Sequence, residues 1–403
     1  MPTEPEETII CFSSQRWRDA MWTNKQHVMS RLAKQHRVVH VDYGLRWLPK
    51  YLAERLWFHG EQSWPPQKML VDGVVHEEGN LFIGDSYSPL SAGVVPHGSW
   101  YRDFFTFDVK ILMLQRFLKR QSIDSPIAWV YHPGFGEAVD RLDKKLLVYD
   151  CVDNYEAFPA YRDDPEWLMQ RERRLCEKAD VVFCTSQALY ETRKAYNPEN
   201  TYLVHNVGDA KHFKTAMEPR TEIAGEIADL DGPVIGFVGA VSDYKLNTDW
   251  LVRAAKARPG WDFAIIGPVG MADPGTEIGD LSALPNVHLL GYRPYEELPK
   301  YLKGVDVTVI PYRLNDYTES VFPIKFFEFM ATGKPVVISR LPALEKFYDA
   351  IEVAGDADEF VARCEFVMEN DDIEDRRQRV ELAKTHSWAK RVETLMEKVT
   401  ERL

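Results

Sequence analysis

The chain has 403 residues, of which 45% are hydrophobic and 28% charged, a composition typical of globular proteins. Its formal net charge of −13 argues against nucleic acid as a partner, because phosphate contacts along a nucleic acid need a clustered basic surface. The length is too great for one ordinary core and predicts two domains of about 200 residues each.

The cysteines and the hydropathy indicate the compartment. Five cysteines are scattered without metal-ligand spacing, which is typical of a reducing compartment. The opening MPTEPEET is acidic and polar, unlike a signal peptide, and no apolar run approaches the ~20 residues of a spanning helix. We therefore expect a cytoplasmic protein, with peripheral attachment to the inner face of a membrane as the alternative.

The chain opens as strand, helix and strand. Thr8–Phe12 and Arg37–Val41 are apolar runs of strand length, and Lys25–Gln35 has the spacing of an amphipathic helix. This βαβ pattern predicts a parallel, doubly wound sheet. No G-x-G-x-x-G follows the first strand, so a dehydrogenase with a bound dinucleotide is disfavoured.

A loop rich in arginine and tryptophan follows the first strand. It includes Arg16, Trp17 and Arg18. In a parallel sheet this loop lies at the carboxyl edge, where ligands of open α/β sheets bind. We predict that these three residues line the acceptor side of a cleft.

The segment Leu45–Gln67 places apolar residues at three- and four-residue spacings beside basic ones. We favour an ordinary helix packed on its domain, because any surface helix is amphipathic in this way. The alternative is an interfacial helix or a floor for a lipid-bearing acceptor, which would give the N-domain peripheral membrane contact. Phe104–Lys119 is a second strongly apolar helix, which we interpret as core.

Two further buried strands of this half end in polar residues. Ile127–Tyr131 is followed by HPG, which contains His132, and Lys145–Tyr149 is followed by DCVDN, which contains Asp153. Both endings face the same crevice if the sheet is parallel. An isolated histidine after a strand is more often structural than catalytic, so the residues alone leave the role of His132 open.

The second half begins after a stretch without periodicity. Charges gather between His205 and Gly232, which predicts an interdomain linker. A buried strand over Pro233–Gly239 then turns through Lys245 into a helix. A glycine at the strand end lets the backbone approach a ligand, and the helix N-terminus favours an anion. The alternative for Lys245 is a solvated lysine at a helix start.

The most informative stretch is Val305–Ser339, which has the pattern of a buried strand, a polar loop, a helix and a second buried strand. Lys325 and Glu328 share one face near the start of that helix. Lys325 could add a cation beside a diphosphate, and Glu328 could accept bonds from the two hydroxyls of a ribose. The alternative is that both belong to the solvated face of an amphipathic helix.

The run PIKFFEFMATGKPVV within this stretch resembles the signature of GT-B glycosyltransferases related to family 4, which lines their nucleotide-sugar site. The resemblance implies that Glu328 binds the donor ribose. In the family an acidic residue, with seven residues between it and this glutamate, reaches the donor sugar. Here Ser320 occupies that position and Glu319 lies one residue away, which leaves open which of the two is used.

The same resemblance implies further donor contacts. Related enzymes carry an arginine directly after the glycine that matches Gly239 and a lysine a few residues later. Ala240 replaces the arginine here, and Lys245 is kept. Lys245 would then share the diphosphate with Lys325 or Arg313. The loop that contains Tyr292 and Arg293 corresponds to the one beside the nucleobase.

On the other side of the cleft, the resemblance implies that His132 and Asp153 lie near the transferred sugar, because related enzymes carry a histidine or an acid at this edge. Asp375–Leu403 has the pattern of two helices with a break near His386, and family members return to the N-domain through such a terminal helix.

We therefore predict an α/β protein of GT-B fold, with two Rossmann-like domains. The expected parts are an acceptor-binding domain over 1–205, a linker over 206–232, a nucleotide-sugar-binding domain over 233–385 and a terminal helix over 386–403. The expected catalytic residues are His132, Asp153, Lys245, Glu319 and Lys325. The expected donor-binding residues are Gly239, Lys245, Tyr292, Arg293, Arg313, Ser320, Lys325 and Glu328.

The predicted function is transfer of a sugar from a UDP- or GDP-sugar to a hydroxyl of a glycan or lipid-linked glycan, as in polysaccharide biosynthesis. Retention of anomeric configuration is implied by the resemblance, and neither a bound cofactor nor a metal is expected. The alternatives are a GT-B epimerase or phosphorylase, or an inactive subunit that only binds a nucleotide-sugar. The inactive subunit is an alternative because of the residues at 240 and 320.

Overall fold

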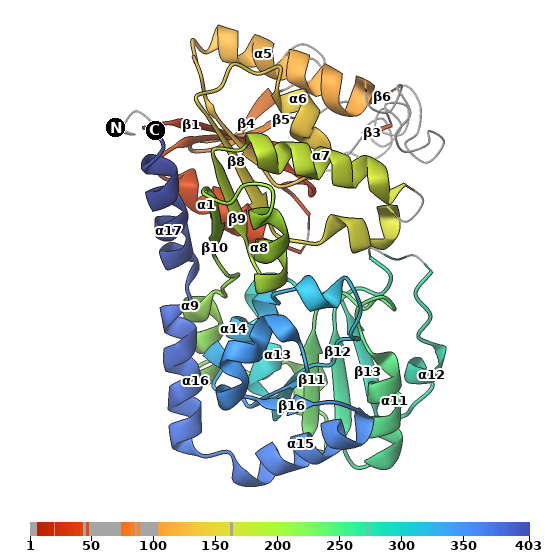
Figure 1. Ribbon diagram of the computed structural model, residues 1–403. Helices are drawn as coiled ribbons and strands as arrows, with labels where there is room; N and C mark the ends of the chain where they lie inside the picture. Colours follow the sequence, from red (N-terminus) through yellow and green to blue (C-terminus); the bar gives the residue numbers. More distant parts are fainter. Residues whose placement is uncertain are drawn as a thin grey trace. The chain divides into compact units, whose positions relative to one another are not determined.

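The computed structural model describes residues 6–19, 21–42, 46–47, 74–84, 87–88, 104–161, 164–271, 273 and 275–403. These residues form two compact units. Unit 1 consists of the described residues of Met1–Thr185, Leu189–Val204 and Val392–Leu403, and unit 2 of those of Ser186–Ala188 and His205–Arg391. Figure 1 labels the helices and strands of both units. In the described part of the chain, no helix is both long and apolar enough to cross a bilayer.

Unit 1 is built on an eight-stranded sheet with the order β10-β9-β8-β7-β1-β2-β5-β4. All neighbours are parallel except β4 and β5. The strands are β1 (Thr8–Ser13), β2 (Arg37–Asp42), β4 (Val74–Glu78), β5 (Leu81–Gly84), β7 (Ile127–Val130), β8 (Leu146–Cys151), β9 (Val181–Cys184) and β10 (Thr201–Leu203). The parallel sheet predicted from the βαβ opening is therefore present.

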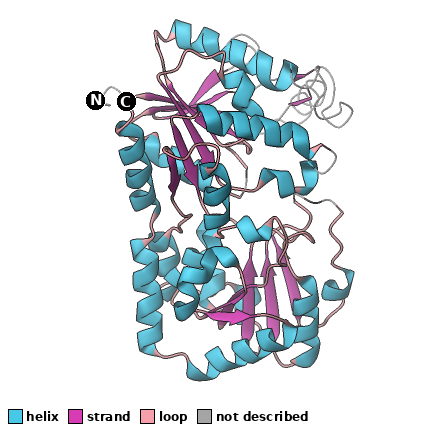
Figure 2. Ribbon diagram, in the orientation of Figure 1, coloured by secondary structure: helices cyan, strands magenta, loops and turns pink. Residues whose placement is uncertain are grey.

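Helices flank this sheet (Figure 2). They are α1 (Asn24–Leu32), α5 (Val109–Arg120), α6 (Gly136–Val139), α7 (Pro165–Lys178) and α8 (Gln187–Lys194). The apolar helix expected over Phe104–Lys119 begins with a π-helical turn over Phe104–Asp108 and continues as α5. The segment Leu45–Gln67 lies outside the described residues apart from Arg46–Trp47 (β3), which pairs with Tyr87–Ser88 (β6).

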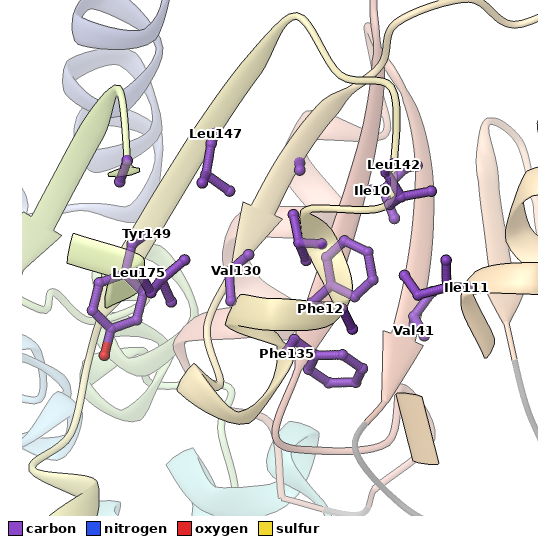
Figure 3. Packing of buried hydrophobic residues seen from close by; sticks show 14 of the residues in the cluster. Ile10, Phe12, Val41, Ile111, Val130, Phe135, Leu142, Leu147, Tyr149 and Leu175 are labelled. Atoms are coloured by element: carbon purple, nitrogen blue, oxygen red, sulfur yellow. The ribbon is translucent and has the colours of Figure 1, made fainter. Parts of the chain in front are cut away.

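The core of unit 1 explains why its strands are continuous apolar runs. Phe12 of β1 and Val130 of β7 point toward the helices (Figure 3). There they belong to one hydrophobic cluster with Phe135, with Ile111 of α5 and with Leu175 of α7. The residues of these strands that alternate with them and point to the other face of the sheet, such as Cys11 and Trp129, are also fully buried. A parallel sheet covered on both faces needs apolar side chains at every position.

Unit 2 is built on a six-stranded sheet in which all neighbours are parallel, with the order β13-β12-β11-β14-β15-β16. Its strands are β11 (Val234–Val238), β12 (Asp262–Ile266), β13 (Val287–Gly291), β14 (Val307–Ile310), β15 (Val336–Ser339) and β16 (Glu352–Ala354). The strand order reverses between β11 and β14. At such a switch point the loops diverge at the carboxyl edge and leave a crevice for a ligand.

The helices of unit 2 are α9 (Ala210–Phe213), α10 (Gly225–Ala228), α11 (Thr248–Ala257), α12 (Gly279–Ser282), α13 (Leu298–Lys303), α14 (Ile324–Ala331), α15 (Ala357–Asn370) and α16 (Ile373–Thr385). The segment 206–232, where we expect a linker, carries α9 and α10 and groups with unit 2. The last helix, α17 (Trp388–Thr400), follows the expected break at His386 and ends among the residues of unit 1.

A buried ion pair joins two helices of unit 1. Arg193 of α8 donates to both carboxylate oxygens of Glu172 on α7, at 3.0 and 2.8 Å. The side chains of both are almost fully buried, and the hydroxyl of Tyr149 also donates to Glu172. Removing one partner of such a pair leaves an uncompensated buried charge.

We predict that Arg193→Leu lowers the free energy of unfolding of unit 1 by about 3–5 kcal/mol, because the carboxylate of Glu172 stays buried without its cation. Urea denaturation at neutral pH measures this. Arg173→Leu is the matched control, since Arg173 of the same helix α7 pairs with Glu177 on the surface and exposed pairs contribute little. Equal losses in the two variants would contradict the prediction.

Candidate functional site

Three neighbouring strands of unit 2 are each followed by, or end in, a glycine with positive φ. These are Gly239 (φ +145°), Gly267 (φ +147°) and Gly291 (φ +68°), after β11, after β12 and at the end of β13. The N–H of Gly267 donates to the carbonyl of Gly291 at 2.8 Å, and a Cβ on Gly267 would lie 2.1 Å from the carbonyl oxygen of Gly239. The strand ends therefore pack backbone against backbone at this edge of the sheet.

Two lysines meet at this edge. Nζ of Lys325, the second residue of α14, lies where a side chain on Gly239 would begin, 2.1 Å from the Cβ position. It is 4.3 Å from the ring centroid of Phe237 and 5.3 Å from that of Tyr312. Nζ of Lys245 lies 5.0 Å from the same Tyr312 ring. The structure thus places Lys325 at Gly239, and it places Lys245 and Lys325 against one shared ring.

Burial lowers the pKa of Lys325, and the charge of Lys245 lowers it further, against the opposing effects of Tyr312 and Glu328. The effect of Lys245 on this pKa shows that the two ammonium groups interact. An anion placed between them would relieve their repulsion.

Hydrogen bonds join the loop that carries Lys245 to the loop that leads into α14, the helix of Lys325. The backbone N–H of Arg313 donates to the carbonyl of Lys245 at 2.9 Å, and the amide of Asn315 donates to the carbonyl of Tyr244 at 2.7 Å. The guanidinium of Arg313 donates to the carbonyl of Asp243 and to the carboxylate of Asp249, both at 3.0 Å. Arg313 therefore braces the Lys245 loop, and its charge is directed at Asp249 and not at the lysine pair.

Glu328 lies one turn further along α14 and is 8% exposed. The hydroxyl of Tyr295 donates to its Oε1 at 2.9 Å. Burial raises the pKa of Glu328 to about 7, although the hydrogen bond from Tyr295 and the charge of Lys325 oppose the shift. The sequence offered the solvated face of a helix as the alternative for Glu328, and a buried carboxylate does not fit that alternative.

His212 positions Tyr295. Its ring stacks on the Tyr295 ring with centroids 4.8 Å apart, and its Nε2 lies 2.8 Å from the carbonyl oxygen of Tyr295. The sequence analysis missed both residues, because His212 falls in the segment expected as a linker and Tyr295 in a loop without a motif.

The turn Asn206-Val207-Gly208-Asp209 packs against the same helix. A Cβ on Gly208 would lie 2.8 Å from the backbone nitrogen of Glu328, so only glycine fits at this position. Asn206 donates to the carbonyl of Phe322 at 3.0 Å just before α14.

The loop before α14 turns Glu319 and Ser320 in different directions. Both belong to a 3₁₀ turn over Thr318–Ser320 that the side chain of Asn315 caps, and Ser320 is 7% exposed whereas Glu319 is exposed. The serine thus faces the protein interior, and the carboxylate of Glu319 is the one that solvent reaches.

The loop after β13 separates its two candidate side chains. Tyr292 is 42% exposed. The guanidinium of Arg293 forms an ion pair with Glu226 of α10 and donates to the hydroxyl of Tyr301 at 2.6 Å. Its contacts are therefore with α10 and α13 and do not include the lysine pair.

In unit 1, His132 and Asp153 follow the neighbouring strands β7 and β8. His132 is buried, and its Nδ1 accepts a bond from the N–H of Gly134 at 3.0 Å. In a neutral ring the proton is then on Nε2, which lies 2.6 Å from the hydroxyl oxygen of Tyr161. Asp153 lies 3.8 Å from Nζ of Lys25, a buried residue of α1 that the sequence analysis read only as part of an amphipathic helix.

The loop after β1 holds the three acceptor-side candidates. Trp17 is buried with its ring edge-on to His40, at 5.4 Å between centroids. Arg18 pairs with Glu77 at 2.6 Å, and Arg16 is exposed. In the described part of the chain, no group of three or more histidine, cysteine, aspartate and glutamate side chains is placed to hold a metal ion.

Comparison with known proteins identifies the second half. Residues 232–370 match a family model described as Glycosyl transferases group 1. TuaH of Bacillus subtilis (strain 168), provisionally named a teichuronic acid biosynthesis glycosyltransferase, is 29% identical over 272 residues, or 64% of this chain and 68% of that protein. D-inositol 3-phosphate glycosyltransferase of Corynebacterium kroppenstedtii is 28% identical over 201 residues, 45% of this chain and 43% of that protein.

Solved structures resemble the whole chain. Sucrose-phosphate synthase from Thermosynechococcus elongatus has a TM-score of 0.69 at 15% identity and covers 98% of this chain and 99% of its own. Anabaena HepE, solved in complex with UDP, has a TM-score of 0.66 at 14% identity, with 98% and 100% covered. A trehalose-6-phosphate protein of E. coli, bound with UDP-2-fluoro glucose, has a TM-score of 0.68 at 10% identity, with 96% and 98% covered. The predicted GT-B fold is confirmed.

The raised pKa of Glu328 leads to a prediction about stability. Between the ordinary glutamate pKa and about 7, the folded protein holds a proton that the unfolded chain has lost. Stability is therefore full below the ordinary pKa and falls as the pH rises to about 7. We predict that Glu328→Gln raises the free energy of unfolding of unit 2 at pH 8 by roughly 1–3 kcal/mol and changes it little at pH 4.

Urea denaturation at both pH values measures the difference. Glu369→Gln, on the exposed face of α15, is the control and should be neutral at both. Equal stability of the wild type and Glu328→Gln at pH 8 would show that Glu328 titrates as an ordinary surface carboxylate.

Proposed function

We propose that the chain is a glycosyltransferase that transfers a sugar from a UDP- or GDP-sugar to a hydroxyl of a glycan or lipid-linked glycan. The match of residues 232–370 to the group 1 family model and the GT-B fold support this proposal. The observation that carries the proposal is Lys325 beside Gly239 and Lys245 on the same Tyr312 ring, with Glu328 one turn along the helix of Lys325. Two cations suit a diphosphate, and a buried carboxylate suits the hydroxyls of a ribose.

The comparisons support this donor class. HepE was solved with UDP and with UDP-glucose, and the E. coli trehalose-6-phosphate protein with UDP-2-fluoro glucose. The name of TuaH supports a role in polysaccharide biosynthesis. We place the activity in the cytoplasm or at the inner face of a membrane.

In the proposed reaction the bond between the anomeric carbon and the diphosphate breaks, and the acceptor oxygen bonds to that carbon with retention of configuration. Negative charge grows on the leaving diphosphate while the sugar becomes oxocarbenium-like. Lys245 and Lys325 stabilise the first change without a bound metal, because they are fixed where that charge develops. The carboxylate of Glu319 offsets the second.

The acceptor side of the proposal rests on unit 1. His132 and Asp153 follow neighbouring strands at its carboxyl edge, and Arg16, Trp17 and Arg18 belong to the loop after β1. We propose that Asp153 and the buried Lys25 orient the acceptor. His132 is held by Gly134 and Tyr161. Because Nε2 carries the ring proton, His132 would donate a hydrogen bond from Nε2 to a sugar oxygen once the Tyr161 hydroxyl moves away. The proton that the acceptor hydroxyl loses would pass to an oxygen of the leaving diphosphate.

Each lysine should matter to turnover. We predict that Lys245→Ala and Lys325→Ala each lower kcat at saturating UDP- or GDP-sugar by about ten- to a thousandfold, the range for loss of one fixed donor at a charged transition state. Lys256→Ala, on the exposed face of α11, is the matched control. Normal turnover of a variant would show that the replaced lysine does not act in the site. Nucleotide binding without transfer by the wild type would indicate an inactive binding subunit.

Glu319 and Ser320 can be told apart by two substitutions. Glu319→Gln should keep donor affinity within about threefold and lower turnover at least about tenfold, because its carboxylate acts on charge that appears only in the transition state. Ser320→Ala should change both by less than about threefold, since Ser320 faces the interior. Calorimetry and initial rates measure both quantities. Normal turnover of Glu319→Gln with lost donor binding in Ser320→Ala would assign the role to the serine.

A further inference from the structure

Tyr312 lies between the two lysines of the donor edge. Its ring is 1% exposed, with Nζ of Lys245 at 5.0 Å and Nζ of Lys325 at 5.3 Å from its centroid. The Phe237 ring lies 4.3 Å from the second ammonium group and the Tyr317 ring 5.9 Å from the first. Both ammonium groups contact the Tyr312 ring.

The backbone fixes this ring from two sides. The N–H of Tyr312 donates to the hydroxyl of Ser339 on β15 at 3.0 Å, and Tyr312 forms an antiparallel bridge with Leu246 of the Lys245 loop. The ring therefore keeps its position when the lysine side chains move.

A shared ring solves an electrostatic problem. Burial disfavours the charged form of Lys325, and the nearby charge of Lys245 disfavours it as well. The face of an aromatic ring attracts cations and does so more strongly where water is excluded. The ring thus offsets part of the repulsion and keeps Lys245 and Lys325 directed to one place.

We propose that Tyr312 is a positioning residue that holds Lys245 and Lys325 as a pair matched to two adjacent phosphates, so that the site selects nucleoside diphosphates over nucleoside monophosphates. The inference rests on the proposed function and adds the residue that positions the two lysines for a diphosphate. Tyr312 touches neither phosphate and acts through the lysines. Glu328 binds the ribose in both nucleotides and does not contribute to this selection.

Calorimetry with UDP and UMP tests the proposal. The wild type should bind UDP at least about thirtyfold more tightly than UMP, and Tyr312→Leu should weaken UDP binding by about tenfold or more while UMP stays within about threefold. Tyr312→Phe loses the hydroxyl, which hydrogen-bonds Lys325, but keeps the ring that both ammonium groups contact, and it should therefore keep the preference for UDP. Tyr348→Leu, at a tyrosine of the same unit whose hydroxyl donates to the carbonyl of Leu341, is the control for lost packing.

The ratio of the two affinities separates positioning from folding. If Tyr312→Leu does not fold, Tyr312→Met fills a similar volume without a ring and should give the same loss of UDP preference. Equal weakening of UDP and UMP, or an unchanged ratio, overturns the role of Tyr312. If the wild type binds neither UDP nor GDP, the proposed function itself fails, and that result is distinct from binding of both nucleotides with no preference.

Discussion

The donor edge of unit 2 depends on holding two positive charges together before an anion arrives. Lys245 belongs to the loop after β11 and Lys325 to the helix α14, and the two are far apart in the sequence. Bringing their charges together costs free energy through electrostatic repulsion and lost hydration. The Tyr312 ring and the backbone hydrogen bonds between the Lys245 loop and the loop before α14 offset part of this free energy. The structure also places glycine at Gly239, because any side chain there would occupy the position of the Lys325 ammonium group.

Glu328 likewise lowers the stability of the fold at a position where its carboxylate suits a ligand. A carboxylate that is 8% exposed is destabilising when ionised, and its pKa near 7 reflects that cost. A fold selected for stability alone would place a neutral or apolar residue there. The hydrogen bond from Tyr295 fixes one oxygen of the carboxylate, which orders the other for a ligand. A site of this kind binds its ligand with little rearrangement because the unfavourable arrangement was built during folding.

The sequence predicted the parts of the site that local pattern determines. Strand ends, the glycine after β11 and the helix that carries Lys325 and Glu328 follow from periodicity and turn chemistry over short windows. Contacts between distant segments could not be predicted this way. The positions of Tyr295, His212 and Tyr312 depend on packing across the sheet. Periodicity over one segment carries no information about such contacts.

The two arginines show what residue type leaves open. Arg313 was expected beside the diphosphate and Arg293 in the loop beside the nucleobase, and in the structure Arg313 pairs with Asp249 and Arg293 with Glu226. A sequence lists the charges but does not say which pairs the fold will satisfy. Lysine differs in this respect, because its single ammonium group forms fewer fixed bonds than a guanidinium. Ala240 stands where the relatives carry an arginine, and the proposed donor edge instead uses two lysines on one aromatic ring, whose backbone is held by Ser339 and Leu246.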